Sequence, residues 1–150
     1  YSKSYGLNIS VLRLFSTYGP KNSEYKVESR IITQLLSNKS IKIGNLYPKR
    51  DFVYIDDVIR AFQIVMKNLK GFHTYNVGSE RSYSIQEICN ILKKLSGKKN
   101  PIIVDKTKLR KNDIKNVVSD CSKIKKLGWK PRVSINKGLE LTLNWYIAKN

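Results

Sequence analysis

The sequence is poor in acids, cysteine and histidine, and the shortage of cysteine and histidine argues against a metal site, a disulfide and a catalytic histidine. Only 11 residues are Asp or Glu against 29 Lys or Arg, so the formal net charge is +18. Cys89 and Cys121 lie far apart, without CxxC spacing or a histidine neighbour, so we expect neither a metal site nor a disulfide. His73, the only histidine, has no catalytic partner at motif spacing, and we expect it to be structural or exposed.

Long hydrophobic runs are also missing. The apolar stretches are only a few residues long and no charged leader precedes one, so we expect neither a membrane-spanning helix nor an export signal. A cytoplasmic protein without a membrane partner is the expectation. With 41% hydrophobic and 10% aromatic residues, 150 residues can nevertheless bury a core, as one domain or a large part of one.

Three phosphate-binding or catalytic motifs are absent as well. The chain contains no GxGxxG, no P-loop and no nucleophile elbow. It opens on Tyr1, and "YSKSYGL" has the pattern of a helix end that runs into a glycine stop at Gly6. We therefore expect a fragment of a longer protein.

Strand and helix patterns alternate along the chain. β-branched and apolar runs predict strands over 8–15, within 38–45, and over 51–55, 74–79 and 101–104. Apolar residues at helical spacing predict helices over 26–36, 57–69, 84–95 and 136–148, with a short helix within 119–131. Ser84 and Glu87 have the spacing of a capping box. "STYGP" (16–20) is typical of a turn and 105–116 of a surface loop, so the class is α/β.

Two adjacent acids, Asp56 and Asp57, allow a catalytic and a structural interpretation. They directly precede the Val58 helix, where a carboxylate accepts hydrogen bonds from free backbone N–H groups and meets the positive end of the helix dipole. A general acid and base pair would instead require both carboxyls to converge on one substrate. We expect the structural role.

Two arginines are candidates for anion binding. Arg50 lies where a loop enters a strand, so its guanidinium is placed either to bind phosphate or carboxylate in two-point fashion, or to pair with Asp51 or another acid. Arg110 and Asp113 could take a phosphate and sugar hydroxyls, or simply belong to a solvated loop. Residue chemistry alone leaves these alternatives open.

The strong positive charge also has two interpretations. Residues 93–132 hold fourteen Lys or Arg against three Asp, a field that attracts phosphorylated ligands or nucleic acid. Lys outnumbers Arg by 22 to 7, however, a bias that genome composition produces without any partner. A basic nucleic-acid-binding module is the alternative function, although the chain has neither an RNP-like aromatic strand nor a recognition-helix signature.

Five segments in order carry a resemblance to a known family. They are "SVLRLFSTYGP", "GNLYPKRDFVYIDDV", "TYNVGSERSYSIQEICNIL", "LRKNDIKNVVSDCSKIKKLGWKP" and "INKGLELTLNWY". Together they resemble the C-terminal half of the NAD-dependent epimerase/dehydratase family, the extended short-chain dehydrogenases that act on nucleotide sugars. "GNLYPKRDF" is most similar to the sugar 4,6-dehydratases, and 4-epimerases share most of the other segments. The resemblance implies the C-terminal portion of a Rossmann-type fold with its substrate-binding subdomain, over residues 1–150.

The resemblance also implies roles for individual residues near the start of the chain. Phe15 would approach the nicotinamide side of the cofactor, and Ser16 occupies a position where the family often has a substrate-contacting Asn. Ile41, Lys42 and Ile43 match the short strand that receives the nucleobase.

Three later residues match the family's diphosphate and ribose contacts. Arg50 matches the arginine that holds the diphosphate, and Arg110 matches a second phosphate-binding arginine. Asp113 stands at the acid position expected to meet ribose, while Lys111 and Asn112 replace the family's Pro-Gly between them.

The resemblance finally implies what the chain does and what it lacks. It implies the part of a 4,6-dehydratase or 4-epimerase that clamps a nucleotide-diphosphate sugar, within an intact enzyme that is a homodimer. NAD or NADP would be bound mainly by an N-terminal Rossmann half, which would also carry the catalytic Tyr-x-x-x-Lys pair. No catalytic residue is assigned to this chain, and it should not turn over alone. A non-catalytic remnant of the family is a further alternative.

Overall fold

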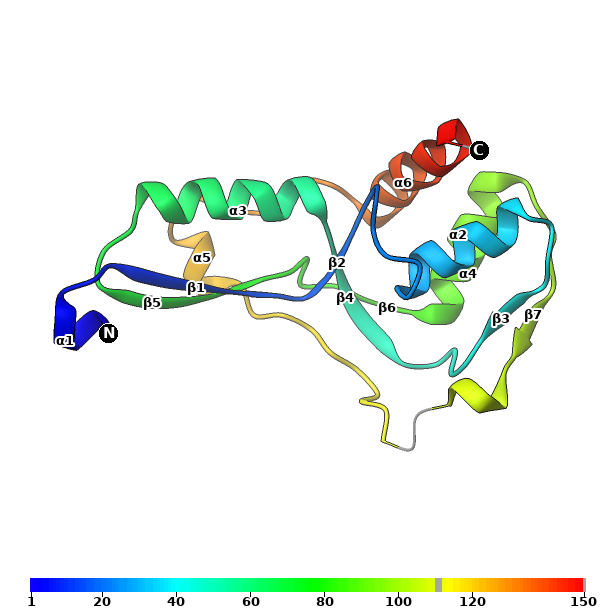
Figure 1. Cartoon of the computed structure of the whole chain (residues 1–150), viewed down its shortest axis with the longest axis horizontal. Helices are drawn as coiled ribbons and strands as arrows, with labels where there is room; N and C mark the ends of the chain where they lie inside the picture. Colours follow the sequence, from blue (N-terminus) through cyan, green and yellow to red (C-terminus); the bar gives the residue numbers. More distant parts are fainter. Residues whose placement is uncertain (110–111, 150) are drawn as a thin grey trace.

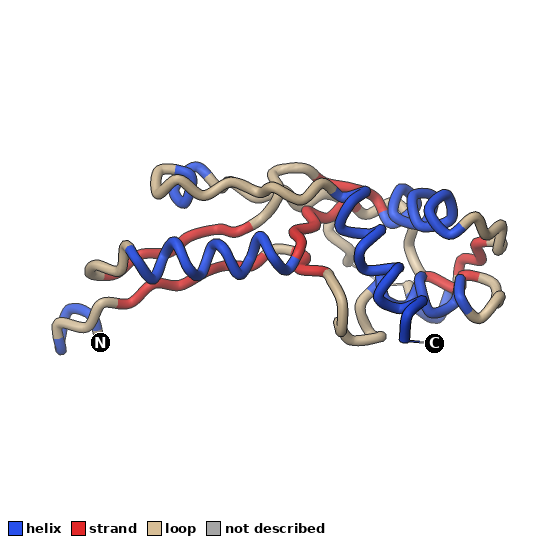
Figure 2. Tube along the Cα trace, turned by 90° about the horizontal axis from the view of Figure 1, so that it is seen from above, coloured by secondary structure: helices blue, strands red, loops and turns tan. Residues whose placement is uncertain are grey.

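The computed structural model describes residues 1–109 and 112–149. The molecule is elongated, with the N-terminus at one end and the C-terminus at the other (Figure 1). A two-stranded sheet and helix α3 form the N-terminal end, and a group of helices with a short sheet forms the C-terminal end (Figure 2). A three-stranded sheet lies between the two ends and joins them.

The N-terminal end is built on two long parallel strands. After α1 (Ser2–Tyr5), β1 (Ile9–Leu14) pairs with β5 (Phe72–Val77), and α3 (Ile55–Lys67) and α5 (Ser122–Lys125) pack beside them. Their buried side chains form one core cluster: Val53, Val58, Ala61, Val65, Tyr75, Val77, Cys121, Ile124 and Trp129. Parallel pairing of strands so far apart in sequence is typical of an α/β protein.

The central sheet contains two strands that local patterns did not predict. Its order is β2 (Ser16–Tyr18), β4 (Lys49–Tyr54), β6 (Ser82–Ser84), with β2 parallel and β6 antiparallel to β4. The prediction of a turn from residue 16 was therefore wrong for its first three residues. Strands of three residues carry almost no periodic signal, and here their long-range partner β4 decides their conformation.

The C-terminal end is mostly helical. It holds α2 (Val27–Leu36), α4 (Ile85–Ser96) and α6 (Ile135–Lys149), with β3 (Ile41–Ile43) paired in parallel with β7 (Ile102–Val104) and followed by the 3-10 helix η1 (Lys106–Lys108). Its core includes Ile31, Leu35, Ile88, Leu92 and Leu139, each with no exposed side-chain surface. The predicted long helices are all present, and η1 adds a short turn to the expected surface loop.

Helix ends follow the predicted chemistry in α4 but not in α3. In α4 the Ser84 hydroxyl accepts from the Glu87 N–H while the Glu87 side chain accepts from the Ser84 N–H, and Gly97 ends the helix with φ 67°. In α3, Asp56 and Asp57 lie in the first turn, yet no side chain caps that helix. The Asp57 carboxylate is buried and accepts instead from the backbone N–H groups of Arg132 (2.9 Å) and Val133 (3.0 Å). The structural role was right and the capping mechanism wrong, because a distant loop supplies the donors.

Several large apolar side chains at the N-terminal end are exposed. Ile59, Phe62 and Met66 lie at helical spacing on α3, and Val11 and Leu14 lie on opposite sides of β1. Parallel sheets are normally covered on both faces and rarely stop at two strands. Across residues 1–109 and 112–149, no helix combines the length and apolarity that crossing a membrane requires.

Candidate functional site

A cavity of about 350 Å³ lies among β2, α2, β3, β4 and η1. Four residues singled out from the sequence line it, although they come from distant parts of the chain: Ser16, Ile43, Arg50 and Asp113. Basic side chains are prominent in its wall, from Lys26, Arg30, Arg50 and Lys108. A concave surface with several cations and one acid is suited to a ligand that carries more than one negative charge.

Arg50 is the most closely held of these residues. Its Nη2 donates to Asp113 Oδ1 at 2.5 Å, and its Nη1 donates to the carbonyl oxygens of Lys49 (2.8 Å) and Ile114 (2.7 Å). The side chains of Arg50 and Asp113 keep 22% and 17% of their surface exposed, so the pair borders the cavity without being sealed from it. Of the two roles proposed for Arg50, the structure contains the ion pair, with Asp113 rather than Asp51.

The guanidinium retains capacity for a ligand. It has five N–H groups in a planar fork, and the bonds to described residues use three of them. A phosphate oxygen could therefore meet the remaining donors, or compete with Asp113 for the Nη2 that it now occupies. The ion pair and the phosphate role do not exclude each other.

The other sequence-predicted residues are distributed unevenly around the cavity. Ile43 lines it, whereas Ile41 is fully buried in the helical core and Lys42 is exposed outside the cavity lining. The Lys42 N–H is already bonded to Gln34 Oε1 at 2.7 Å, so that backbone group is not open to a nucleobase in this state. Arg110 lies outside the described residues.

Sequence reasoning missed three of the four cations. Lys26 immediately precedes α2 and Arg30 lies four residues on, so one face of the helix start directs both toward the cavity. Lys108 comes from η1, which approaches so closely that a Cβ on Gly44 would lie 2.5 Å from the Lys108 carbonyl oxygen. The i, i+4 spacing of Lys26 and Arg30 could have predicted that both lie on one helix face. No local pattern predicts that Lys108 lines the same cavity.

Phe15 lines a second cavity, of about 520 Å³, next to the first. Leu14, Gly19 and Pro20 share this wall, and Lys26 borders both cavities. The Phe15 N–H donates to the Val77 carbonyl at 3.0 Å, which ties the end of β1 to the end of β5. The wall is mixed, with Phe15 and Tyr18 beside the polar Thr17 and Asn22, and Lys26 stands at the junction with the basic cavity.

Two acids near the cavity have shifted pKa values with clear causes. Burial raises the pKa of Glu28, whose carboxylate accepts from Asn22 Nδ2 at 2.6 Å. Hydrogen bonds from Thr107 and Lys108 lower the pKa of Asp105 to about 2. Asp105 thus stays ionised and holds the turn that carries Lys108. Within the described residues, no three His, Cys, Asp or Glu side chains cluster in a way that could hold a metal ion.

Comparison with known proteins gives this arrangement a family. The family model of GDP-mannose 4,6-dehydratase matches residues 1–142. The chain belongs to this family. The family is that of the NAD-dependent epimerases/dehydratases of the extended short-chain dehydrogenase type, as the sequence resemblance predicted.

The family's curated members and solved structures agree. A UDP-glucuronate 4-epimerase from Thermodesulfobacterium geofontis is 40% identical over 97% of this chain and 45% of its own length. The UDP-glucose 4-epimerase of Thermotoga maritima, solved with UDP-glucose, superposes with a TM-score of 0.90 at 29% identity, over 99% of this chain and 48% of that one. The UDP-glucuronic acid 4-epimerase of Bacillus cereus, solved with UDP-glucuronic acid and NAD, gives 0.87 at 30% identity, over 99% and 48%. These likenesses confirm the α/β fold class, and the chain spans about half the length of the relatives it matches.

Proposed function

We propose that the chain is the C-terminal, nucleotide-sugar-binding part of an NAD- or NADP-dependent 4,6-dehydratase or 4-epimerase. The observation that carries the proposal is the basic cavity, in which Arg50, Lys26 and Arg30 face one space beside Asp113. The diphosphate of a nucleotide sugar carries two negative charges for these cations, and its ribose offers hydroxyls to the carboxylate. Family membership and the nucleotide sugars bound in related structures support the same ligand class.

In this proposal the chain binds the diphosphate of the substrate and does not itself supply the reacting groups. Holding the unreactive diphosphate orients the sugar, and such binding energy is what places a reacting carbon correctly. The sugar would extend past Ser16 toward the cavity of Phe15, since Lys26 borders both spaces. When bound there, the nicotinamide cofactor would accept and return a hydride at sugar C4. In this chain we assign no residue to that step.

The rest of the enzyme would cover the exposed apolar side chains of β1 and α3. Leu14, Phe62 and Met66 are among them, and a two-stranded parallel sheet gains stability from further strands and covering helices. We propose that a cofactor-binding part of the same protein covers them, since the relatives are about twice as long as this chain. We also propose that the intact enzyme is a homodimer in the cytoplasm.

The test uses the full-length protein and a panel of UDP-, dTDP-, GDP- and CDP-sugars, followed by calorimetry and by detection of a 4-keto product or an epimer. Arg50→Ala should weaken binding of the preferred nucleotide sugar about 10- to 100-fold, because hydrogen bonds to charged groups contribute about 1.5–3 kcal/mol. Arg81→Ala, which removes an equal charge from a different cavity, is the matched control and should bind normally.

Asp113→Asn separates a phosphate role of Arg50 from a purely structural one. The probe is inorganic pyrophosphate. If Arg50 only holds Asp113 in place, Arg50→Ala and Asp113→Asn should lose pyrophosphate binding equally. The clamp predicts that Asp113→Asn keeps pyrophosphate binding while Arg50→Ala loses it. No binding of any nucleotide sugar by the wild type, together with steeply salt-dependent binding of random oligonucleotides, would favour the nucleic-acid alternative instead.

A further inference from the structure

Residues 113–119, which we call the strap, run alongside β4. The Lys49 N–H donates to the Lys115 carbonyl at 2.9 Å, and the Val117 N–H donates to the Lys49 carbonyl at 3.1 Å. These two bonds make an isolated parallel bridge between Lys49 and Asn116, so the strap meets the start of β4 at one position. The strap carries Asp113 at the end that borders the basic cavity.

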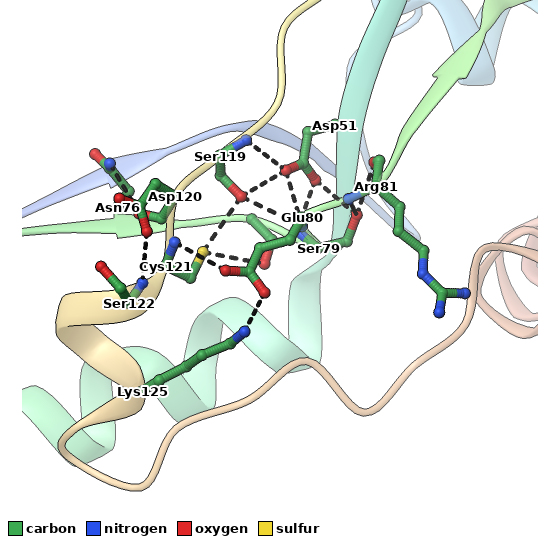
Figure 3. Close-up of polar contacts among 11 residues, drawn as sticks. Asp51, Asn76, Ser79, Glu80, Arg81, Ser119, Asp120, Cys121, Ser122 and Lys125 are labelled. Carbon is green, nitrogen blue, oxygen red and sulfur yellow. Dashed lines mark hydrogen bonds and ion pairs between the residues drawn. The ribbon is translucent and has the colours of Figure 1, made fainter.

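The far end of the strap is bonded to a buried carboxylate. Asp51 keeps only 1% of its surface exposed, and its two oxygens accept five hydrogen bonds (Figure 3). Ser119 donates its N–H (2.9 Å) and its hydroxyl (2.5 Å), while Ser79 donates its N–H (2.6 Å) and hydroxyl (2.7 Å) and Glu80 its N–H (3.0 Å). A carboxylate has about four lone-pair positions, so Asp51 is saturated.

This cluster is packed as well as bonded. A Cβ on Gly78 would lie 2.7 Å from the Asp51 carboxylate and equally close to the Ser119 Cβ, so only glycine lets the turn after β5 approach. The Cys121 side chain lies 3.2 Å from the Ser119 hydroxyl. Three chain segments that are distant in sequence therefore meet at one side chain of β4.

Arg50 and Asp51 hold the two ends of the strap from neighbouring positions. Successive side chains of a strand point to opposite faces, so Arg50 reaches Asp113 at the cavity and Asp51 reaches Ser119 on the buried side. The Arg50 contact is open to competition from a bound phosphate, whereas the saturated and buried Asp51 contact is not. The strap's side-chain attachments therefore differ: the one at Asp113 is exchangeable and the one at Ser119 is permanent, with the backbone bonds to Lys49 between them.

We propose that Asp51, through Ser119, is a positioning residue for the nucleotide clamp. It keeps the strap in register on β4, so that Asp113 stays beside the ligand when a diphosphate takes over part of Arg50. Its charge matters because hydrogen bonds to a carboxylate are about twice as strong as neutral ones. The inference rests on the proposed function and assigns no ligand contact to Asp51 itself.

The experiment compares Ser119→Ala with the rescue variant Ser119→Thr, which keeps the hydroxyl, in the full-length protein. Thr142→Val is the matched control, since it removes one buried hydroxyl whose bond runs within α6 to the Gly138 carbonyl. Ser119→Ala should weaken nucleotide-sugar binding about tenfold and raise KM with kcat nearly unchanged, the loss expected for a hydrogen bond to a charged group. Ser119→Thr and Thr142→Val should bind like the wild type.

Hydrogen exchange without ligand provides the second readout. The amides of Val117 and Ser119 should exchange at least several-fold faster in Ser119→Ala and at wild-type rates in Thr142→Val. Asp51→Asn should give the same pattern more strongly; if it does not fold, Ser119→Ala still decides. Wild-type affinity and exchange in Ser119→Ala would overturn this inference and leave the proposed function standing. Absence of nucleotide-sugar binding by the wild type would overturn both.

Discussion

At the residue scale, the arrangement depends on contacts between side chains and distant loops. Asp57 bonds to backbone 75 and 76 residues away, and Arg50 bonds to Asp113 and Ile114 from 63 and 64 residues away. In each case the sequence identified the polar residue but not its partner. Local spacing encodes i, i+3 and i, i+4 neighbours, whereas partners across the fold depend on topology.

Gly44 is predicted to control how closely η1 approaches the cavity. Gly44→Ala places a Cβ 2.5 Å from the Lys108 carbonyl, so η1 must move and take the Lys108 side chain with it. We expect nucleotide-sugar affinity to fall about 3- to 10-fold, the loss of one exposed charge contact of up to about 1 kcal/mol with some added displacement. Titration calorimetry measures this.

The control for Gly44→Ala is Gly71→Ala. Gly71 has φ 61° and open space around it, so alanine there costs backbone strain without a local clash. That variant should lower the unfolding temperature and leave affinity unchanged. Equal affinities for both variants would contradict the role given to Gly44.

Glu28 is predicted to make stability depend on pH. Burial raises its pKa in the folded state, so the folded protein binds a proton that the unfolded chain releases, and stability falls as pH rises through the window above the ordinary glutamate pKa. Glu28→Gln keeps an acceptor for Asn22 and removes this effect. Urea unfolding at several pH values should show a variant that gains stability over the wild type as pH rises. A difference that is constant with pH would refute the assignment.

At the scale of elements, a helix end is set locally when all of its capping partners lie within the same turn. The capping box of α4 satisfies both partners, and the bonds from Ser84 lower the pKa of Glu87. Its sequence signature, Ser84 followed by Glu87, was sufficient to predict the start of the helix. The three-residue strands β2 and β6 have no comparable signature, because only pairing with β4 defines them.

Loss of the capping box should measurably destabilise the protein. Ser84→Ala is expected to cost about 1 kcal/mol and lower the unfolding temperature by about 2–4 °C. Because the Glu87 pKa is lowered in the folded state, its contribution is present near neutral pH and lost as pH falls through that pKa. Thermal unfolding followed by circular dichroism at neutral and acidic pH tests both points, with Ser96→Ala at the other end of α4 as the control. An equal effect of both variants at all pH values would contradict the prediction.

At the scale of the whole molecule, two core clusters are joined by one small sheet. Ile55 packs against both clusters, at the point where β4 passes into α3. The basic cavity lies toward the helical end, and the exposed apolar side chains of β1 and α3 lie at the other. Ligand binding and covering by further chain thus involve different parts of the molecule.

The exposed apolar side chains of α3 should make the 150-residue chain associate in solution. Met66→Lys combined with Ile59→Lys should reduce association and dye binding while leaving the unfolding temperature within a few degrees, because both side chains are already exposed. Analytical ultracentrifugation and thermal unfolding measure these effects. The control, Lys67→Ala with Lys70→Ala, lowers the net charge by two without changing the exposed apolar side chains, and a rise in association of similar size in that variant would point to charge repulsion instead.

Sequence alone determined the class, the long helices and the family, because periodic burial and ordered motifs are local properties of the chain. The sequence also identified Ser16, Ile43, Arg50 and Asp113 as candidates for ligand binding, and all four line one cavity. Tertiary structure alone decided that Arg50 meets Asp113, that Lys108 enters the same cavity and that Asp51 holds Ser119. The physical reason is that a parallel topology brings remote segments side by side, and the adjacent side chains of β4 then serve opposite faces.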